Sequence, residues 1–132
     1  MSNKFIVEII TPDKSILKSE AHEVTVPSYE GQMGILKDHI SLITFLRPGI
    51  IIIQGQEEKN YYVEEGTVEF SNNNLLILTS TIRDLKELSQ NSIADLLSQA
   101  QNKLSDNNSS DKEKYLLSYK ISTLKEINQK TI

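Results

Sequence analysis

Apolar and polar positions alternate in short runs through the first 84 residues. Val24 and Val26 alternate with polar neighbours, and so do Val68 and Phe70. A period of two is typical of a strand that buries one face. Further strands are expected at 4–10, 14–17, 40–46, 50–54, 60–63 and 75–79. Because residues that favour turns separate many short strands, the pattern predicts an antiparallel β-sandwich or barrel, and we take the sandwich as the expected class.

The period changes to that of a helix after residue 85. Apolar residues share one face of each of two helices, with Ile93, Leu96, Leu97, Ala100 and Leu104 on the first and Leu117, Ile121 and Leu124 on the second. Ser92 and Asp95 are expected to cap the first helix, and the second is expected to begin near Asp111. A short polar stretch, 105–110, separates the two helices, and this arrangement predicts an antiparallel hairpin.

The chain therefore has two expected units, a β-sandwich at 1–84 followed by a two-helix hairpin at 85–132. Composition changes at the same place, because all five glycines and three prolines precede residue 67 and the last arginine is Arg83. The first unit has seven basic and twelve acidic residues, and the second has seven and six. The first unit is therefore acidic and the second nearly neutral.

The second helix has more apolar surface than one partner helix needs. Leu116 and Ile127 lie to one side of its apolar stripe, and Tyr115 and Tyr119 lie nearly opposite the stripe. Either a second face is buried, or these side chains are exposed, as scattered apolar residues often are. Lys120 belongs to a set of lysines that forms either a solvated face or a contact with an acidic partner.

Composition excludes several classes of protein. A net charge of −4, from 14 Lys and Arg against 18 Asp and Glu, argues against a general nucleic-acid binder. Without cysteine there is no disulfide, thiolate metal site or thiol nucleophile. The apolar runs are too short for a membrane span, and the N-terminus has no recognisable leader. We therefore expect a reducing, cytoplasm-facing compartment.

Candidate catalytic residues are few. Asp38, His39 and Ser41 are of the types found in nucleophile–base–orienter sets, but neighbouring residues point in different directions. The spacing of Gly31 and Gly34 fits neither nucleotide-binding glycine motif, and the two histidines lack metal-ligand spacing. We expect no catalytic residue, no metal and no resident cofactor. The two glycines are expected to allow turns or bulges that a Cβ would strain.

The segment 27–49 reads PSYEGQMGILKDHISLITFLRPG. This segment resembles the signature of the epsilon subunits of F-type ATP synthases. The resemblance rests on the glycine pair with Leu36, on His39 and on the closing Leu-x-Pro-Gly. Segments 7–13, 62–66 and 76–83 resemble the same family. The resemblance is dense over residues 4 to about 84 and extends to the helical tail by its pattern.

The resemblance implies a part of the rotating central stalk that couples proton flow to ATP synthesis without bond chemistry of its own. It implies that the sandwich binds the gamma subunit and sits on the rotor ring of c subunits, at the cytoplasmic face of a bacterial inner membrane. Its hairpin would restrain hydrolysis by docking on the catalytic alpha/beta hexamer. The candidate rotor-ring contacts are Glu30, Gly31, Gly34 and His39, and the candidate hairpin contacts are Leu116, Lys120 and Ile127.

Other functions stay open beside this one. The first helix has Gln99 where some relatives have the arginine of Asp-x-x-Arg-Ala, and the spacing from Asp95 differs by one. Because phosphate recognition favours arginine, we expect the hairpin to bind ATP weakly or not at all. The alternatives are a free-standing cytoplasmic adaptor that binds a protein partner and a small hydrolase built on Asp38 and His39.

Overall fold

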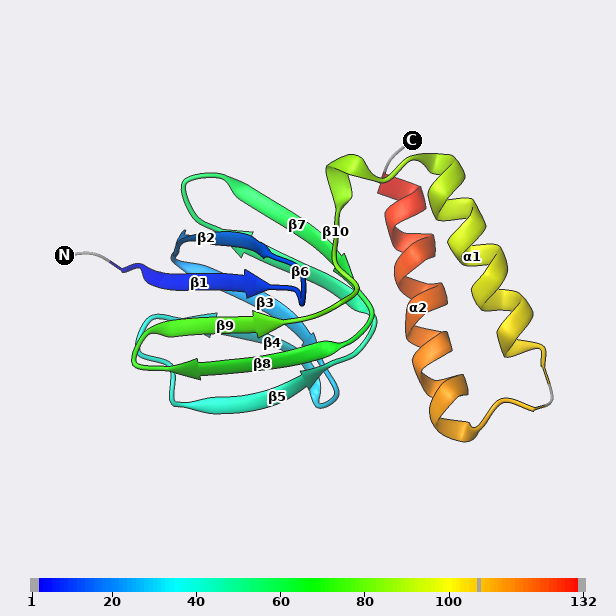
Figure 1. Ribbon diagram of the computed structural model, residues 1–132, viewed down its shortest axis with the longest axis horizontal. Helices are drawn as coiled ribbons and strands as arrows, with labels where there is room; N and C mark the ends of the chain where they lie inside the picture. The colour runs from blue at the N-terminus through cyan, green and yellow to red at the C-terminus, as the bar shows by residue number, and fades with distance from the viewer. Residues whose placement is uncertain (1–2, 107, 131–132) are drawn as a thin grey trace.

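The structure is a computed structural model, and it describes residues 3–106 and 108–130. The strands are β1 (Phe5–Ile10), β2 (Ser15–Ala21), β3 (Glu23–Ser28), β4 (Gly31–Leu36), β5 (Leu42–Leu46), β6 (Gly49–Gln54), β7 (Glu58–Val63), β8 (Gly66–Ser71), β9 (Asn74–Leu78) and β10 (Arg83–Asp84). The short 3-10 helix η1 (Leu85–Glu87) follows, and then α1 (Gln90–Leu104) and α2 (Asp111–Lys130). The predicted class, a β-sandwich followed by a helical hairpin, is confirmed (Figure 1).

The strands form one curled sheet in the order β10-β7-β6-β3-β5-β8-β9-β1-β2, and β4 is added beside β3. The pairs are antiparallel with one exception, β1 and β9, which run parallel with Val7 opposite Leu75. A parallel pair needs a long connection, and here most of the sandwich lies between the two strands.

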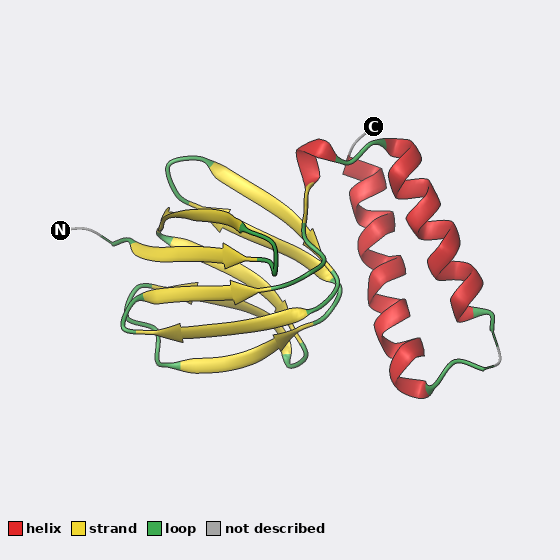
Figure 2. Ribbon diagram, in the orientation of Figure 1, coloured by secondary structure: helices red, strands yellow, loops and turns green. Residues whose placement is uncertain are grey.

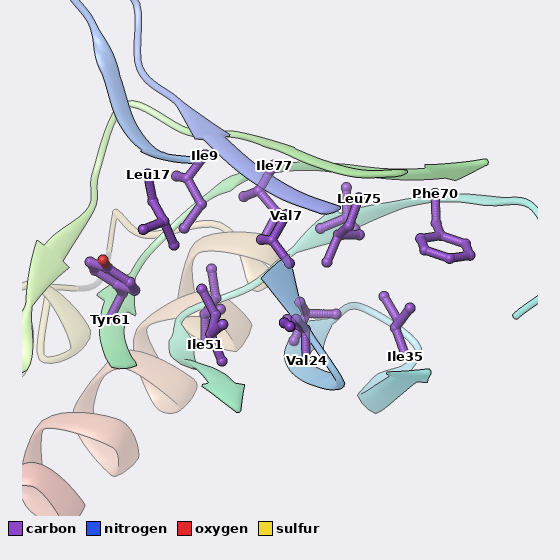
Figure 3. Packing of buried hydrophobic residues seen from close by; sticks show 14 of the residues in the cluster. Val7, Ile9, Leu17, Val24, Ile35, Ile51, Tyr61, Phe70, Leu75 and Ile77 are labelled. Atoms are coloured by element: carbon purple, nitrogen blue, oxygen red, sulfur yellow. The ribbon is translucent and has the colours of Figure 1, made fainter. Parts of the chain in front are cut away.

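The core lies between the two layers of the sandwich. Figure 3 shows Val7 and Ile77 from one layer facing Val24 and Ile51 from the other. Each of these side chains is completely buried, and full burial of such a side chain stabilises the fold by about 1.5–3 kcal/mol. The run Ile50–Ile53 is covered on both faces, because Ile51 and Ile53 enter the core and Ile50 packs beneath the hairpin.

Strand β4 was not among the predicted strands. Only Ile35 of its six residues is fully buried, and two of the others are glycines. Alternation of apolar and polar residues is therefore too weak in β4 to predict a strand. The strand exists because it pairs along its whole length with β3, from Glu23 opposite Leu36 to Ser28 opposite Gly31.

The first helix begins earlier than its predicted cap. Ser89 is the N-cap of α1, and its side-chain oxygen accepts a hydrogen bond from the Ser92 amide at 3.1 Å. The predicted capping pair of Ser92 and Asp95 is therefore wrong, because both residues lie inside the helix. Ser89 is also a good capping residue, and sequence alone did not distinguish two serines one turn apart.

Helix α2 lies between α1 and the sandwich (Figure 2). Its sandwich-facing side packs against β6, and its other side packs against α1. No helix in the described ranges is long and apolar enough to span a lipid bilayer.

Candidate interaction surfaces

The turn between β3 and β4 presents Glu30 at one end of the sandwich. Ser28 fixes this turn, because its hydroxyl donates to the Gly31 carbonyl at 2.7 Å and accepts from the Glu30 amide at 3.2 Å. Gly31 has φ +121°, a conformation that favours glycine. The turn therefore holds the exposed Glu30 side chain on a defined backbone.

Gly34 has a different role from the one predicted. It lies in the middle of β4 without a positive φ, and a Cβ there would meet only a Glu23 carboxylate oxygen at 3.9 Å. The expectation that Gly34 relieves backbone strain is therefore wrong. The fold accepts a side chain at this exposed position.

His39 lies at the opposite end of β4 from Glu30. Its ring contacts Phe70 edge-on at 6.0 Å between centroids, and its Nδ1 lies 2.7 Å from the Ile40 carbonyl oxygen. A six-residue strand spans roughly 16 Å. Glu30 and Gly31 are therefore brought together at the end of the sandwich that faces the hairpin, while His39 lies at the other end (Figure 1).

The loop that carries His39 is tied to the β8–β9 turn. The Asp38 amide donates to Asn73 Oδ1 at 2.7 Å, and Asn73 Nδ2 donates back to the Asp38 carboxylate at 3.0 Å. The Asp38 carboxylate is thus engaged by an amide, and His39 Nδ1 by a backbone carbonyl. The described hydrogen bonds of Asp38 and His39 therefore do not assemble a nucleophile–base pair.

One outer face of the sandwich carries several exposed apolar side chains beside the charged Glu69 and Glu8. It consists of β5, β8, β9 and β1, and its exposed apolar residues include Ile43 (74 % exposed), Phe45 (58 %) and Leu78 (43 %). Phe45, Thr67, Leu78 and Ile10 form one row across the four strands. A groove of about 780 Å³ runs along this row. Exposed apolar side chains gathered beside a groove make this face a candidate interaction site.

These exposed apolar residues were not predicted as a contact surface. Its signal lies in β5, where Ile43 and Phe45 alternate with Thr44 and Leu46. Ile43 and Phe45 are exposed, whereas Thr44 and Leu46 face the core.

A second apolar cluster holds the hairpin on the sandwich. Tyr62 from β7, Ile93 from α1, and Leu124 and Ile127 from α2 are its buried members. Ile127 is only 2 % exposed, so in this conformation it contacts the chain's own sandwich. Leu116 is half-buried and lines a groove between α2 and the sandwich. Both residues belong to the second buried face that the pattern left open.

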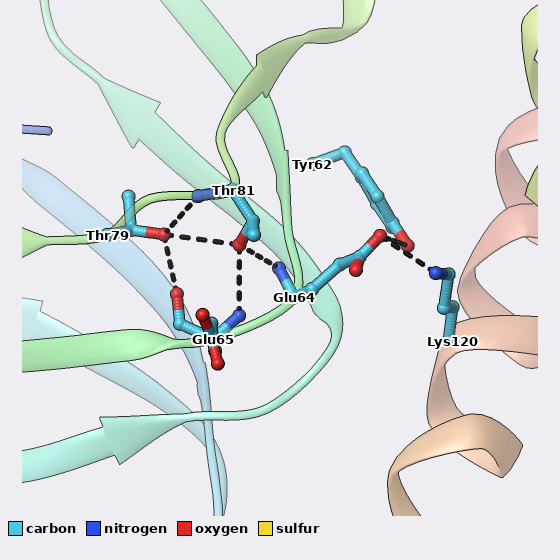
Figure 4. Close-up of polar contacts among 6 residues, drawn as sticks. All are labelled: Tyr62, Glu64, Glu65, Thr79, Thr81 and Lys120. Atoms are coloured by element: carbon cyan, nitrogen blue, oxygen red, sulfur yellow. Dashed lines mark hydrogen bonds and ion pairs between the residues drawn. The ribbon is translucent and has the colours of Figure 1, made fainter. Parts of the chain in front are cut away.

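Lys120 forms an ion pair with Glu64 of the sandwich. Its Nζ lies 3.1 Å from Glu64 Oε2, and the same oxygen accepts a hydrogen bond from the Tyr62 hydroxyl at 3.0 Å (Figure 4). Burial, and after it the Glu64 carboxylate, raise the pKa of Tyr62. Thr81 fixes the backbone of this turn, because its Oγ1 accepts from the Glu64 amide at 3.1 Å. The acidic partner of Lys120 therefore lies within the chain.

Four side chains form a stack beside this ion pair. The Tyr29 and Tyr115 rings meet edge-on at 6.3 Å, and Tyr115 meets Tyr119 at 5.0 Å. The Arg47 guanidinium lies 3.9 Å above the centre of the Tyr119 ring. A side-chain hydrogen bond with Tyr119 is the main cause that raises the pKa of Tyr115. Tyr29 and Arg47 were not predicted as contacts, because their partners are distant in sequence.

The sandwich is similar in sequence to a known family. Residues 4–84 match the family described as ATP synthase, Delta/Epsilon chain, beta-sandwich domain. The chain is 51 % identical to the ATP synthase epsilon chain of Pelagibacter ubique over 130 residues, which are 97 % of this chain and 100 % of that one. It is 33 % identical to the ATP synthase epsilon chain of a Bradyrhizobium species over 103 residues, 77 % of this chain and 76 % of that one.

Solved structures have the same fold. A chain in the mitochondrial ATP synthase of Euglena gracilis (OSCP/F1/c-ring) matches with a TM-score of 0.78 at 19 % identity, covering 100 % of this chain and 84 % of that one. A chain in the central stalk and c-ring of the Tetrahymena thermophila mitochondrial ATP synthase matches with a TM-score of 0.62 at 18 % identity, covering 96 % of each. At this identity the likeness concerns the fold.

Proposed function

Because the chain belongs to the family of ATP synthase epsilon chains, we propose that its sandwich joins the gamma subunit to the rotor ring and transmits torque between them. The chain is a central-stalk subunit of an F-type ATP synthase and is not itself catalytic. Its own role is mechanical, because coupling needs surfaces that bind firmly and a body that does not deform.

The exposed apolar face carries this proposal. Ile43 and Phe45 project from β5 next to the groove along Leu78, and an apolar sheet face of this kind needs a partner to cover it. We assign this face to the gamma subunit. Glu30, on the turn at the hairpin end, is assigned to the polar loops of the rotor ring, where exposed charge fixes register more than affinity.

The position of His39 indicates that it contacts a different partner from Glu30. Because the two lie at opposite ends of β4, a single small patch on the ring does not reach both. His39 is followed by the exposed Ile40, and this connection leads into β5, which carries the exposed Ile43. Its contact is therefore proposed at the edge of the gamma-binding surface, with the ring contact left to Glu30, Gly31 and Gly34.

The membrane location follows from the complex. A subunit that rests on the rotor ring is peripheral, and we propose the cytoplasmic face of a bacterial inner membrane. The alpha/beta hexamer is proposed as the partner of the hairpin when it leaves the sandwich. Leu116, Lys120 and Ile127 would then exchange contacts within the chain for contacts with the hexamer.

The test replaces the apolar face with polar β-formers. The double variant Ile43→Thr and Phe45→Thr should keep its melting temperature within a few degrees, because both side chains are exposed. It should nevertheless lose gamma and the hexamer in a pull-down. Leu36→Thr, at an exposed position on β4, is the matched control and should retain both partners. A tagged chain that never brings down gamma would instead support the adaptor alternative.

The same complexes test the proposed ring contact. Glu30→Ala should lower the number of protons pumped for each ATP hydrolysed and leave gamma in the pull-down, whereas His39→Ala should weaken the capture of gamma. Equal effects of both variants on both readouts would contradict the separation of the two ends.

A further inference from the structure

The stack of Tyr29, Tyr115, Tyr119 and Arg47 joins three separate parts of the chain. Tyr29 belongs to the β3–β4 turn and Arg47 to the connection between β5 and β6, while the other two tyrosines lie one turn apart on α2. A single helix face therefore touches both sandwich connections that lie beneath it.

Helix α2 contacts the sandwich near both of its ends, and the ion pair of Lys120 with Glu64 lies between them. Near its end, Ile127 and Leu124 pack with Tyr62 in the second apolar cluster. Near its beginning, the stack attaches Tyr115 and Tyr119 to Tyr29 and Arg47. The first place fixes the helix to the body of the sandwich. The second fixes it to the turn that carries Glu30.

The chemistry of the stack makes it a weak and reversible contact. Edge-to-face rings and a guanidinium over a ring attract each other beyond their burial. Arg47 Nη1 also donates to the Pro48 carbonyl at 3.0 Å, but its Nε is buried and has no hydrogen-bond partner in the described part of the chain. Loss of water from this atom costs free energy, which offsets part of the attraction.

We propose that this stack is a latch that couples the β3–β4 turn to the docking of the hairpin. A protein surface that engages the turn and draws Tyr29 away from Tyr115 removes one of the attachments of α2, so the hairpin is released more easily. Because coupling between two sites is reciprocal, an undocked hairpin in turn leaves the turn less ordered. The inference rests on the proposed ring contact at Glu30 and on a hairpin with two positions.

The coupling is measured in the isolated full chain. The chain has no cysteine, so Ser41→Cys and Ser98→Cys, both at exposed positions, accept a pair of spin labels without competing sites. The distance between sandwich and α1 then reports docking. Tyr29→Ala and Tyr115→Ala should each lower the ratio of docked to undocked chains about 2- to 12-fold.

The double variant separates the latch from two independent effects. In the chain with both Tyr29→Ala and Tyr115→Ala, the loss of docking free energy should be smaller than the sum of the two single losses. The reason is that each single variant already removes the contact between the two rings. Tyr115→Phe is the matched control, because it keeps the ring and should retain most of the docking. Ile127→Asp with Lys120→Glu should release the hairpin outright, which proves that the labels detect release.

Hydrogen exchange tests the reciprocal half. In the released variant, the amides of Glu30 and Gly31 should exchange faster than in the unmodified chain, while those of the β8–β9 turn should not change. Unchanged distances in Tyr29→Ala, or unchanged exchange at the turn, would overturn the proposal. Because no assembled complex is used, these outcomes do not depend on whether the hairpin acts on hydrolysis.

Discussion

At the scale of single residues, the fold requires glycine at some positions and only tolerates it at others. Gly66 has φ +150°, and a Cβ there would collide with the Leu78 carbonyl oxygen and touch Thr79. Gly34 has neither constraint. The sequence motif contains glycines of both kinds, and only the backbone conformation distinguishes them.

This difference gives a stability prediction. Gly66→Ala should lower the free energy of unfolding by about 1–3 kcal/mol, because alanine would be strained at this φ and its Cβ would collide with the backbone of Leu78. Gly34→Ala should change it little or raise it by about 0.5 kcal/mol, because alanine restricts the unfolded chain. Urea unfolding of both variants measures this. Equal destabilisation would refute the assignment, and any cost of Gly34→Ala should instead appear in the assembled complex.

At the scale of elements, the predictable parts of the fold are those that alternation or a helical period specifies. The buried residues Val24, Val26, Val68 and Phe70 all lie on strands predicted from their alternation. Strand β4 was not predicted, because its pairing with β3, rather than a pattern in its own side chains, makes it a strand. Local pattern predicts an element only where the element's own side chains decide its burial.

The contacts of the hairpin show the same limit. The pattern of α2 indicated that Tyr115, Tyr119, Leu116 and Ile127 exceed what one helix can bury, and the structure places most of this excess on the sandwich. The pattern of α2 did not predict which sandwich residues it contacts, because Tyr62 and Glu64 are far from α2 in sequence. The same holds for the pairing of Lys120 with Glu64.

The separation of the two apolar clusters predicts that the sandwich folds alone. The main core consists of sandwich residues from Phe5 to Ile77, whereas only the second cluster includes hairpin residues. A chain that ends at Asp84 should unfold cooperatively and still capture gamma. It should lose about 1–3 kcal/mol relative to the full chain, because Tyr62 becomes exposed. Thermal unfolding and a pull-down measure both. A truncated chain without a cooperative transition would contradict two units.

At the scale of the whole molecule, the docked hairpin has to give up specific contacts before it can act elsewhere. The ion pair of Lys120 with Glu64, the burial of Ile127 and the ring contacts of Tyr115 are all lost when α2 leaves the sandwich. For the proposed release of the hairpin, the free energies of its docked and released positions need differ by only a few kcal/mol.

The first consequence concerns the nucleotide. The last arginine is Arg83, and the basic side chains of the hairpin itself are all lysines. Because the planar guanidinium binds phosphate with two hydrogen bonds at once, ATP titrated into the purified chain should show no binding below millimolar concentration. Calorimetry measures this directly. Micromolar affinity would mean that lysines and the polar groups around α2 suffice.

The second consequence is a pair of opposite effects on hydrolysis by the assembled complex. Deletion of residues 89–132 should raise the rate, because no hairpin remains to restrain rotation. Tyr115→Ala should lower it, because a weakened docked state leaves more hairpins free to reach the hexamer. Tyr115→Phe serves as the control and should leave the rate close to that of the unmodified complex. If deletion and Tyr115→Ala changed the rate in the same direction, one hairpin with two positions could not explain both, whereas an unchanged rate in both would make the hairpin a passive appendage.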